Sequence, residues 1–108
     1  MNLMCPARLI LLPPGSRAYL AGERVAGVYA TPDAEEPAAR LAEELGIRLT
    51  LLPMPAPAEV VVREIADQHR GETVVVIALT LDLGLQLPAV IEHEGDGWVV
   101  VPVSGPAR

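Results

Sequence analysis

Apolar residues occur along this chain in short runs that alternate with segments of helical spacing. Four runs rich in aliphatic residues, each stopped by Pro, Gly or polar residues, predict buried strands at 8–12, 24–30, 47–52 and 73–79. The last run, TVVVIAL, is the richest in β-branched residues. It is therefore predicted to lie at the centre of the sheet.

Two segments between these runs have the spacing of amphipathic helices. In 34–45, Ala and Leu recur every three or four residues, and Gly46 follows where a helix C-cap belongs. Pro37 lacks an N–H and restricts the residue before it, which favours a regular helix that begins only there. Residues 57–70 form the second helical segment, with Pro57 suited to the first helical position.

The last third of the chain predicts a hairpin preceded by an irregular connection. AVIEHE (89–94) and WVVVPV (98–103) read as two strands joined by the turn Gly-Asp-Gly. Leu residues alternate through 80–88 as in a strand, but a crossover is needed there, so we expect a short irregular helical turn. The whole pattern predicts a single α/β domain over 1–108: three layers, a mostly parallel sheet with helices on its faces, and a C-terminal antiparallel hairpin.

Composition adds an expectation about self-association. The 108 residues are 51% hydrophobic and only 3% aromatic, with a mean hydropathy of +0.35. A domain this small buries a limited share of its surface, so part of the apolar area is expected to remain outside. A second copy of the chain is the simplest cover for such a patch, which predicts a homodimer.

Charge, cysteine count and run lengths exclude several classes of protein. The net charge is −6, and the eight basic residues, all Arg, are scattered without a basic patch, which argues against nucleic-acid binding. The single Cys5 permits neither an intramolecular disulfide nor a multi-Cys metal site. No apolar run approaches the ~20 residues that span a bilayer, and the opening is too short and too rich in Pro for a signal peptide. We expect a cytoplasmic protein with no membrane segment, metal or cofactor.

Three segments, taken in order, resemble the histidine phosphatase superfamily, which has the phosphoglycerate-mutase-like fold. RLILLPPG (8–15) is similar to the first strand that leads into that family's Arg-His-Gly motif. VYATPDAEEPAARLAEELGI (28–47) resembles its Tyr-Ser-Ser-Pro segment and the helix that follows. HRGETVVVIALT (69–80) resembles the helix end and strand before its Ser-His-Gly motif. The resemblance covers most of the chain and implies a truncated phosphoglycerate-mutase-like domain.

The same resemblance implies that the catalytic chemistry is lost. The Arg-His-Gly positions hold Pro13 and Pro14 before the Gly, so the nucleophilic His is missing. The family's second phosphate-binding Arg falls at Glu35 or an acidic neighbour, and its second His falls at Leu79. Phosphoryl transfer depends on positioning and on stabilising negative charge, which Glu, Pro and Leu cannot supply. We therefore expect a non-catalytic protein with a structural or binding role.

A binding module for an anion or a phosphometabolite is the first alternative. A Gly turn after a parallel strand, leading towards a helix, is a place where phosphates bind. The candidate residues are Gly15, Ser16, Arg17, Thr31 and Thr80. If these residues have no binding role, they form a polar rim over a filled crevice.

An enzyme of altered chemistry is the second alternative, and it would need Ser16 or Cys5 as a new nucleophile without an evident base nearby. His69 lies at a helix C-terminus, where a structural role is expected. His93 lies in a charged strand, and the residues next to it in sequence point to the opposite face of the sheet. Trp98 begins the last strand and is expected to pack in the core or at an interface.

Overall fold

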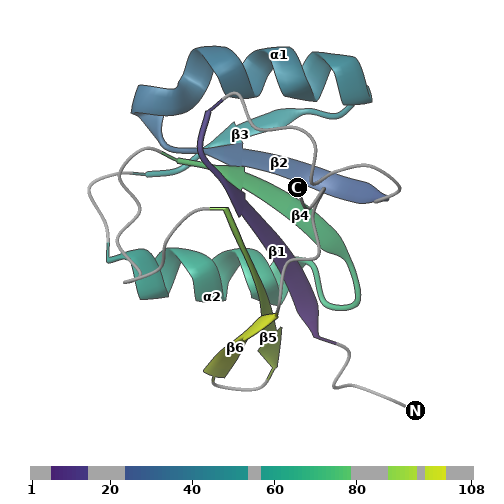
Figure 1. Ribbon diagram of the computed structural model, residues 1–108, viewed down its shortest axis with the longest axis vertical. Coiled ribbons are helices and arrows are strands. Elements are labelled where there is room, and N and C mark those ends of the chain that lie inside the picture. The colour runs from purple at the N-terminus through teal and green to yellow at the C-terminus, as the bar shows by residue number, and fades with distance from the viewer. Residues whose placement is uncertain (1–5, 15–23, 54–56, 79–87, 95–96, 102–108) are drawn as a thin grey trace, which may run out of the picture.

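Six strands form one mixed sheet in the order β3-β2-β4-β1-β5-β6 (Figure 1). The computed structural model describes residues 6–14, 24–53, 57–78, 88–94 and 97–101. The strands are β1 (Ala7–Leu12), β2 (Val25–Ala30), β3 (Leu49–Leu51), β4 (Thr73–Ile77), β5 (Ala89–Glu94) and β6 (Gly97–Val101). The helices are α1 (Glu35–Leu45) and α2 (Ala58–Gln68), with a 3-10 turn, η2 (Pro32–Ala34), before α1. The predicted α/β class is confirmed.

Strands β1 and β4 lie at the centre of this sheet and run parallel. Leu12 is opposite Ile77 in their register, and Ala30 of β2 is opposite Ile77 on the other side of β4. β3 runs parallel to β2, whereas β5 is antiparallel to β1 and β6 is antiparallel to β5. The strand predicted from 73–79 therefore takes the central place that its β-branched composition favours.

Alternate residues of the central strands enter two separate hydrophobic clusters. Leu9 and Leu11 of β1 belong to the cluster that contains the inward residues of α2, and Ile10 and Leu12 to the cluster that contains those of α1. The two helices accordingly lie on opposite faces of the sheet (Figure 1). Complete burial of one such side chain contributes about 1.5–3 kcal/mol. A strand with both faces covered therefore reads as an uninterrupted apolar run.

Helix α1 differs from its prediction at the start and agrees at the end. It begins at Glu35, not at Pro37, and the 3-10 turn leads directly into it. Pro37 stands in the first helical turn, where the N–H groups have no intrahelical acceptor, so the missing donor costs nothing there. At the other end Gly46 has a φ of 70° and the N–H of Ile47 reaches the carbonyl of Ala42 at 2.9 Å, which is a Schellman closure.

The remaining elements follow the predictions with small changes. Pro57 is the N-cap of α2 with extended ψ, not its first helical residue. The third strand is only Leu49–Leu51, shorter than the apolar run 47–52. It lies at the edge of the sheet and pairs with β2 alone among the described residues. The predicted helical turn over 80–88 falls, except for Pro88, outside the described residues.

Candidate functional site

The carboxyl ends of β1, β4 and β2 meet at one edge of the sheet. The N–H of Ala78 donates to the carbonyl of Leu12 at 3.1 Å, and the N–H of Thr31 donates to the carbonyl of Ile77 at 3.2 Å. The residues that follow the three strands are therefore neighbours, and they are Pro13, Ala78 and Thr31. Ligands bind at this edge in open parallel sheets. It is the place where sequence reasoning puts the remnant of a phosphate site.

Thr31 is buried at this edge and its hydroxyl is already engaged. The hydroxyl donates to Oδ1 of Asp33 at 2.5 Å, and the Thr31 carbonyl accepts from the N–H of Ala34 at 2.9 Å. Both contacts close the 3-10 turn that starts α1. A hydroxyl that donates to a carboxylate cannot at the same time donate to a bound anion. The contact therefore opposes the predicted anion-binding role of Thr31.

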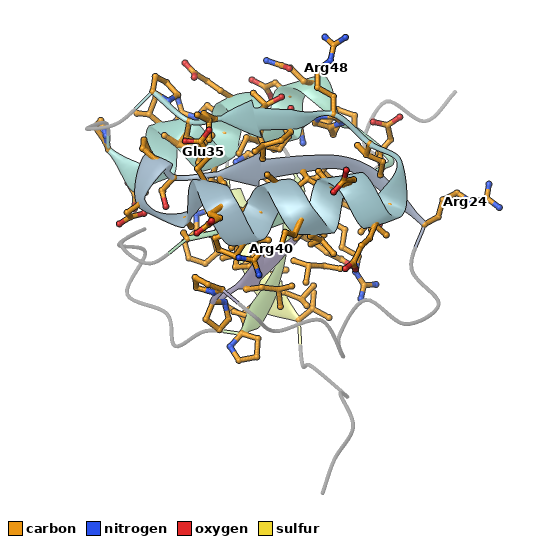
Figure 2. The ribbon with its side chains drawn as sticks, turned by 90° about the horizontal axis from the view of Figure 1, so that it is seen from above. Arg24, Glu35, Arg40 and Arg48 are labelled. Carbon is orange, nitrogen blue, oxygen red and sulfur yellow. The ribbon has the colours of Figure 1, made fainter. Side chains whose placement is uncertain are left out.

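The charges near this edge are acidic. Asp33, Glu35 and Glu36 follow β2 directly and are exposed, and Figure 2 shows Glu35 at the start of α1. Arg24 stands at the opposite end of that view, before the start of β2. Arg48 projects outward ahead of β3. Within the described residues, then, the edge where β1, β2 and β4 end has carboxylates and no guanidinium.

The other predicted site residues lie beyond what the structure describes. These residues are Gly15, Ser16, Arg17, Leu79 and Thr80. β1 and β4 run parallel with Leu12 opposite Ile77, so residues 13 and 78, which follow them, lie side by side. The roles of the five residues stay predictions.

A chain of three polar side chains joins the end of α2 to β2. The Tyr29 hydroxyl lies 2.7 Å from Nε2 of His69, and Nδ1 of His69 lies 2.7 Å from Oε1 of Glu72. The carboxylate only accepts, so Nδ1 of His69 donates to Glu72; in the tautomer with its proton on Nδ1, Nε2 accepts from the Tyr29 hydroxyl. The two rings meet edge to face with their centroids 5.6 Å apart.

This arrangement of a carboxylate, an imidazole and a hydroxyl has the connectivity of a catalytic triad but not its chemistry. Burial raises the pKa of the Tyr29 hydroxyl above its ordinary value of 10.0, and the negative charge of Glu72 raises it further. A hydroxyl with a raised pKa needs a base to act as a nucleophile, and His69 is placed to be one, so a substrate would have to reach this contact. The cavity of about 180 Å³ that Tyr29 helps to line has neither His69 nor Glu72 on its wall. The three residues therefore fix α2 against β2.

Sequence reasoning placed His69 in a structural role at a helix end but missed its partner Tyr29. Gly27, two residues before Tyr29 on β2, lies beside the imidazole: a Cβ there would be in van der Waals contact with Cε1 of His69 at 3.4 Å. Tyr29 and His69 are 40 residues apart, so no local pattern links them. The contact exists only once β2 and β4 pair.

A second polar group lies where α2 meets the hairpin of β5 and β6. His93 is 2% exposed, and the guanidinium of Arg70 donates to its carbonyl at 2.9 Å and to Asp67 at 2.7 Å. A cavity of about 310 Å³ opens beside His93 and is lined also by Glu59, Arg63, Gly97 and Trp98. Trp98 packs on the α2-side cluster, as predicted. The burial of His93 was not foreseen, although Ala89 and Ile91 on the same face of β5 signal it.

The described residues contain neither a metal-binding cluster nor a helix that could span a membrane. No group of three or more His, Cys, Asp and Glu side chains in this part of the chain is arranged to hold a metal ion. None of its helices has the length and apolar character needed to cross a bilayer.

Comparison with models of protein families, with curated proteins and with solved structures finds no match for this chain. The class that the structure defines is therefore an α/β domain with a six-stranded mixed sheet and two helices.

Proposed function

We propose that this protein is a non-catalytic relative of the histidine phosphatases, and that it serves as a structural or binding protein in the form of a homodimer. Its fold would be a reduced, three-layer version of the phosphoglycerate-mutase-like fold. One observation carries the proposal: the ends of β1, β2 and β4 converge on Pro13, Thr31 and Ala78. The resemblance places a phosphatase's nucleophilic His at Pro14 and its phosphate-binding arginines at Pro13 and Glu35, and these residues supply neither an imidazole nor a cation.

The energetic argument concerns the charge that develops during phosphoryl transfer. An arginine that stabilises the transferred group can contribute about 10³–10⁵ to the rate. At the corresponding place this chain has Glu35, and Asp33 and Glu36 stand beside it. Carboxylates at that position repel a phosphoryl group in both ground and transition states. Loss of the nucleophile removes the covalent route as well.

The first test is a phosphatase assay on the purified full chain with a chromogenic phosphate ester. We expect no turnover above that of buffer. Leu79→His should not restore activity, because the attacking residue, the arginines and the proton donor are still missing. Turnover in the unmodified chain that disappears in Ser16→Ala or Cys5→Ser would overturn the proposal in favour of an enzyme of altered chemistry.

The second test separates a structural role from a phosphate-binding module. Thermal unfolding is followed with inorganic phosphate and a panel of phosphorylated metabolites, since a ligand at 100 times its Kd stabilises a fold by about 2.7 kcal/mol. We expect no shift. A shift that Arg17→Ala abolishes and Arg24→Ala retains would replace the structural role by anion binding. Arg24 is the matched control because it precedes β2, at the opposite end of that strand from Glu35 (Figure 2).

A further inference from the structure

The two edges of the sheet differ in how open they are to another strand. β3, at one edge, has three residues, and the charged Arg48 precedes it. β6, at the other edge, has five residues, and among the described residues it pairs with β5 alone. Proteins protect such edges by shortening them or by adding charges, prolines or bulges. The short β3 follows that rule.

β6 does not follow it. Between Gly97 and Val101 the strand has no charged side chain, no proline and no irregularity in its pairing with β5. Val99 is 63% exposed and Val100 is 51% exposed, the two most exposed large hydrophobic side chains of the described residues. They lie on opposite faces of the sheet, since successive strand residues alternate. The whole edge, not one face, is therefore apolar.

We propose that β6 pairs with β6 of a second copy in antiparallel fashion, about a two-fold axis at Val99. This inference rests on the homodimer of the proposed function and names its interface. In this register Val99 faces its own counterpart, Trp98 faces Val100 of the other copy, and Gly97 faces Val101. Aromatic and β-branched residues make favourable cross-strand pairs. Self-complementarity of this kind is what a two-fold interface requires.

The acidic charge of the chain opposes self-association. The net charge is −6, so two copies repel each other unless their acidic residues are kept apart. Glu92 is opposite Val99 on β5, and two such residues in the dimer would be separated by three strand spacings. Three spacings are about 14 Å, which exceeds the screening length of about 8 Å at physiological salt. The repulsion between these two carboxylates is therefore small.

The size of the interface predicts the strength of the dimer. Five residues of one strand, with two exposed valines and part of a tryptophan, fall well short of the ~800 Å² per partner of a standard stable interface. Interfaces below that size form weak, reversible complexes. The dimer is therefore concentration-dependent, and its population rises between micromolar and millimolar protein.

Sedimentation over that concentration range tests the proposal with two matched arginine variants. Val99→Arg places a charge on the edge and should leave the chain monomeric at concentrations where the unmodified protein dimerises. Val60→Arg is the control, because Val60 is also an exposed valine, 41% exposed, but lies on α2. It should dimerise as the unmodified chain does. Thermal unfolding of each variant verifies that the fold is retained.

Cross-linking tests the register and does not depend on the arginine variant folding. Directly opposed residues of an antiparallel pair have Cα atoms about 4.5–5.5 Å apart, within the range of about 4.4–6.8 Å that a disulfide allows. In a Cys5→Ser background, Val99→Cys should therefore form a disulfide-linked dimer on oxidation. Val100→Cys and Val60→Cys should cross-link far more slowly.

The outcomes distinguish this interface from the homodimer itself. A dimer that survives Val99→Arg and shows no preferred cross-link at 99 would overturn the β6 interface and leave a homodimer with another surface. A chain that stays monomeric at all concentrations and does not cross-link would overturn both. A monomer that dimerises only after removal of residues 102–108 would mean that the chain's own end covers β6, which also overturns the proposal.

Discussion

Removing the Tyr29 hydroxyl is the sharpest test of how α2 is held on the sheet. Tyr29→Phe keeps the ring in its place and deletes only the donor that lies 2.7 Å from Nε2 of His69. Tyr29 is 9% exposed and the His69 side chain is 15% exposed, so water reaches the abandoned imidazole nitrogen only in part. A hydrogen bond of this kind is worth about 0.5–1.5 kcal/mol net. We expect a loss of about 1 kcal/mol in the free energy of unfolding at neutral pH.

A double-mutant cycle measures this contact and excludes a general effect of the substitution. Urea unfolding is followed for the unmodified chain, Tyr29→Phe, His69→Ala and the double variant. A loss of 1 kcal/mol lowers the melting temperature of a domain of this size by about 4 °C. In the His69→Ala background, Tyr29→Phe should cost close to nothing, so the coupling energy should equal most of the single loss.

Two results would refute the reasoning. A loss below about 0.3 kcal/mol in Tyr29→Phe would mean that the hydroxyl contributes nothing net, which lies under the range for a made hydrogen bond. An equal loss with and without His69 would mean that the hydroxyl acts through another partner. Glu72→Gln serves as a milder companion change, because its amide oxygen still accepts from Nδ1 of His69 and only the charge is lost.

Three further predictions concern pH, a helix end and the core. The pKa of Tyr29 is raised in the fold, so its contribution to stability is complete below about pH 10 and is lost as pH rises through the folded value; alkaline unfolding of Tyr29→Phe should lack this component. Gly46→Ala, at a φ of 70° with no atom within 4 Å of a new Cβ, should lose about 1 kcal/mol through backbone strain alone, and Gly46→Asn should lose less in thermal unfolding. Leu9→Ala, in a fully buried site, should cost about 2–5 kcal/mol in urea unfolding, whereas Leu45→Ala, 38% exposed, should cost far less.

The sequence predicted those parts of the fold that depend on local pattern and on burial of both faces. The run 73–79 has apolar residues at successive positions, and only a strand covered on both sides can use all of them. The end of α1 at Gly46 was predictable because a glycine at that position adopts positive φ freely. The start of α1 at Glu35 was missed because Pro37 was taken as a limit, although a proline in the first turn removes no hydrogen bond.

The polar contacts were less predictable, for a physical reason. Tyr29 meets His69 because β2 pairs with β4 and α2 crosses over both, and neither residue has a local signature of the other. His93 was partly predictable. It continues the face of β5 that Ile91 buries, and the charge of Glu92 belongs to the opposite face. The period-two alternation of β5 is therefore a better guide to the burial of His93 than the charges next to it in sequence.

Among the described residues, the start of α1 opposes anion binding at the edge where β1, β4 and β2 end, even though the backbone direction there favours it. A helix N-terminus carries about half a positive charge, which in phosphate-binding folds attracts the ligand. Here Glu35 and Glu36 occupy the first turn, and Asp33 accepts from Thr31 just before it. These carboxylates are attached to the same backbone, so they offset the helix dipole at this end of α1. The same residues stabilise the helix. The carboxylates that stabilise α1 therefore also weaken the attraction of its N-terminus for a phosphate.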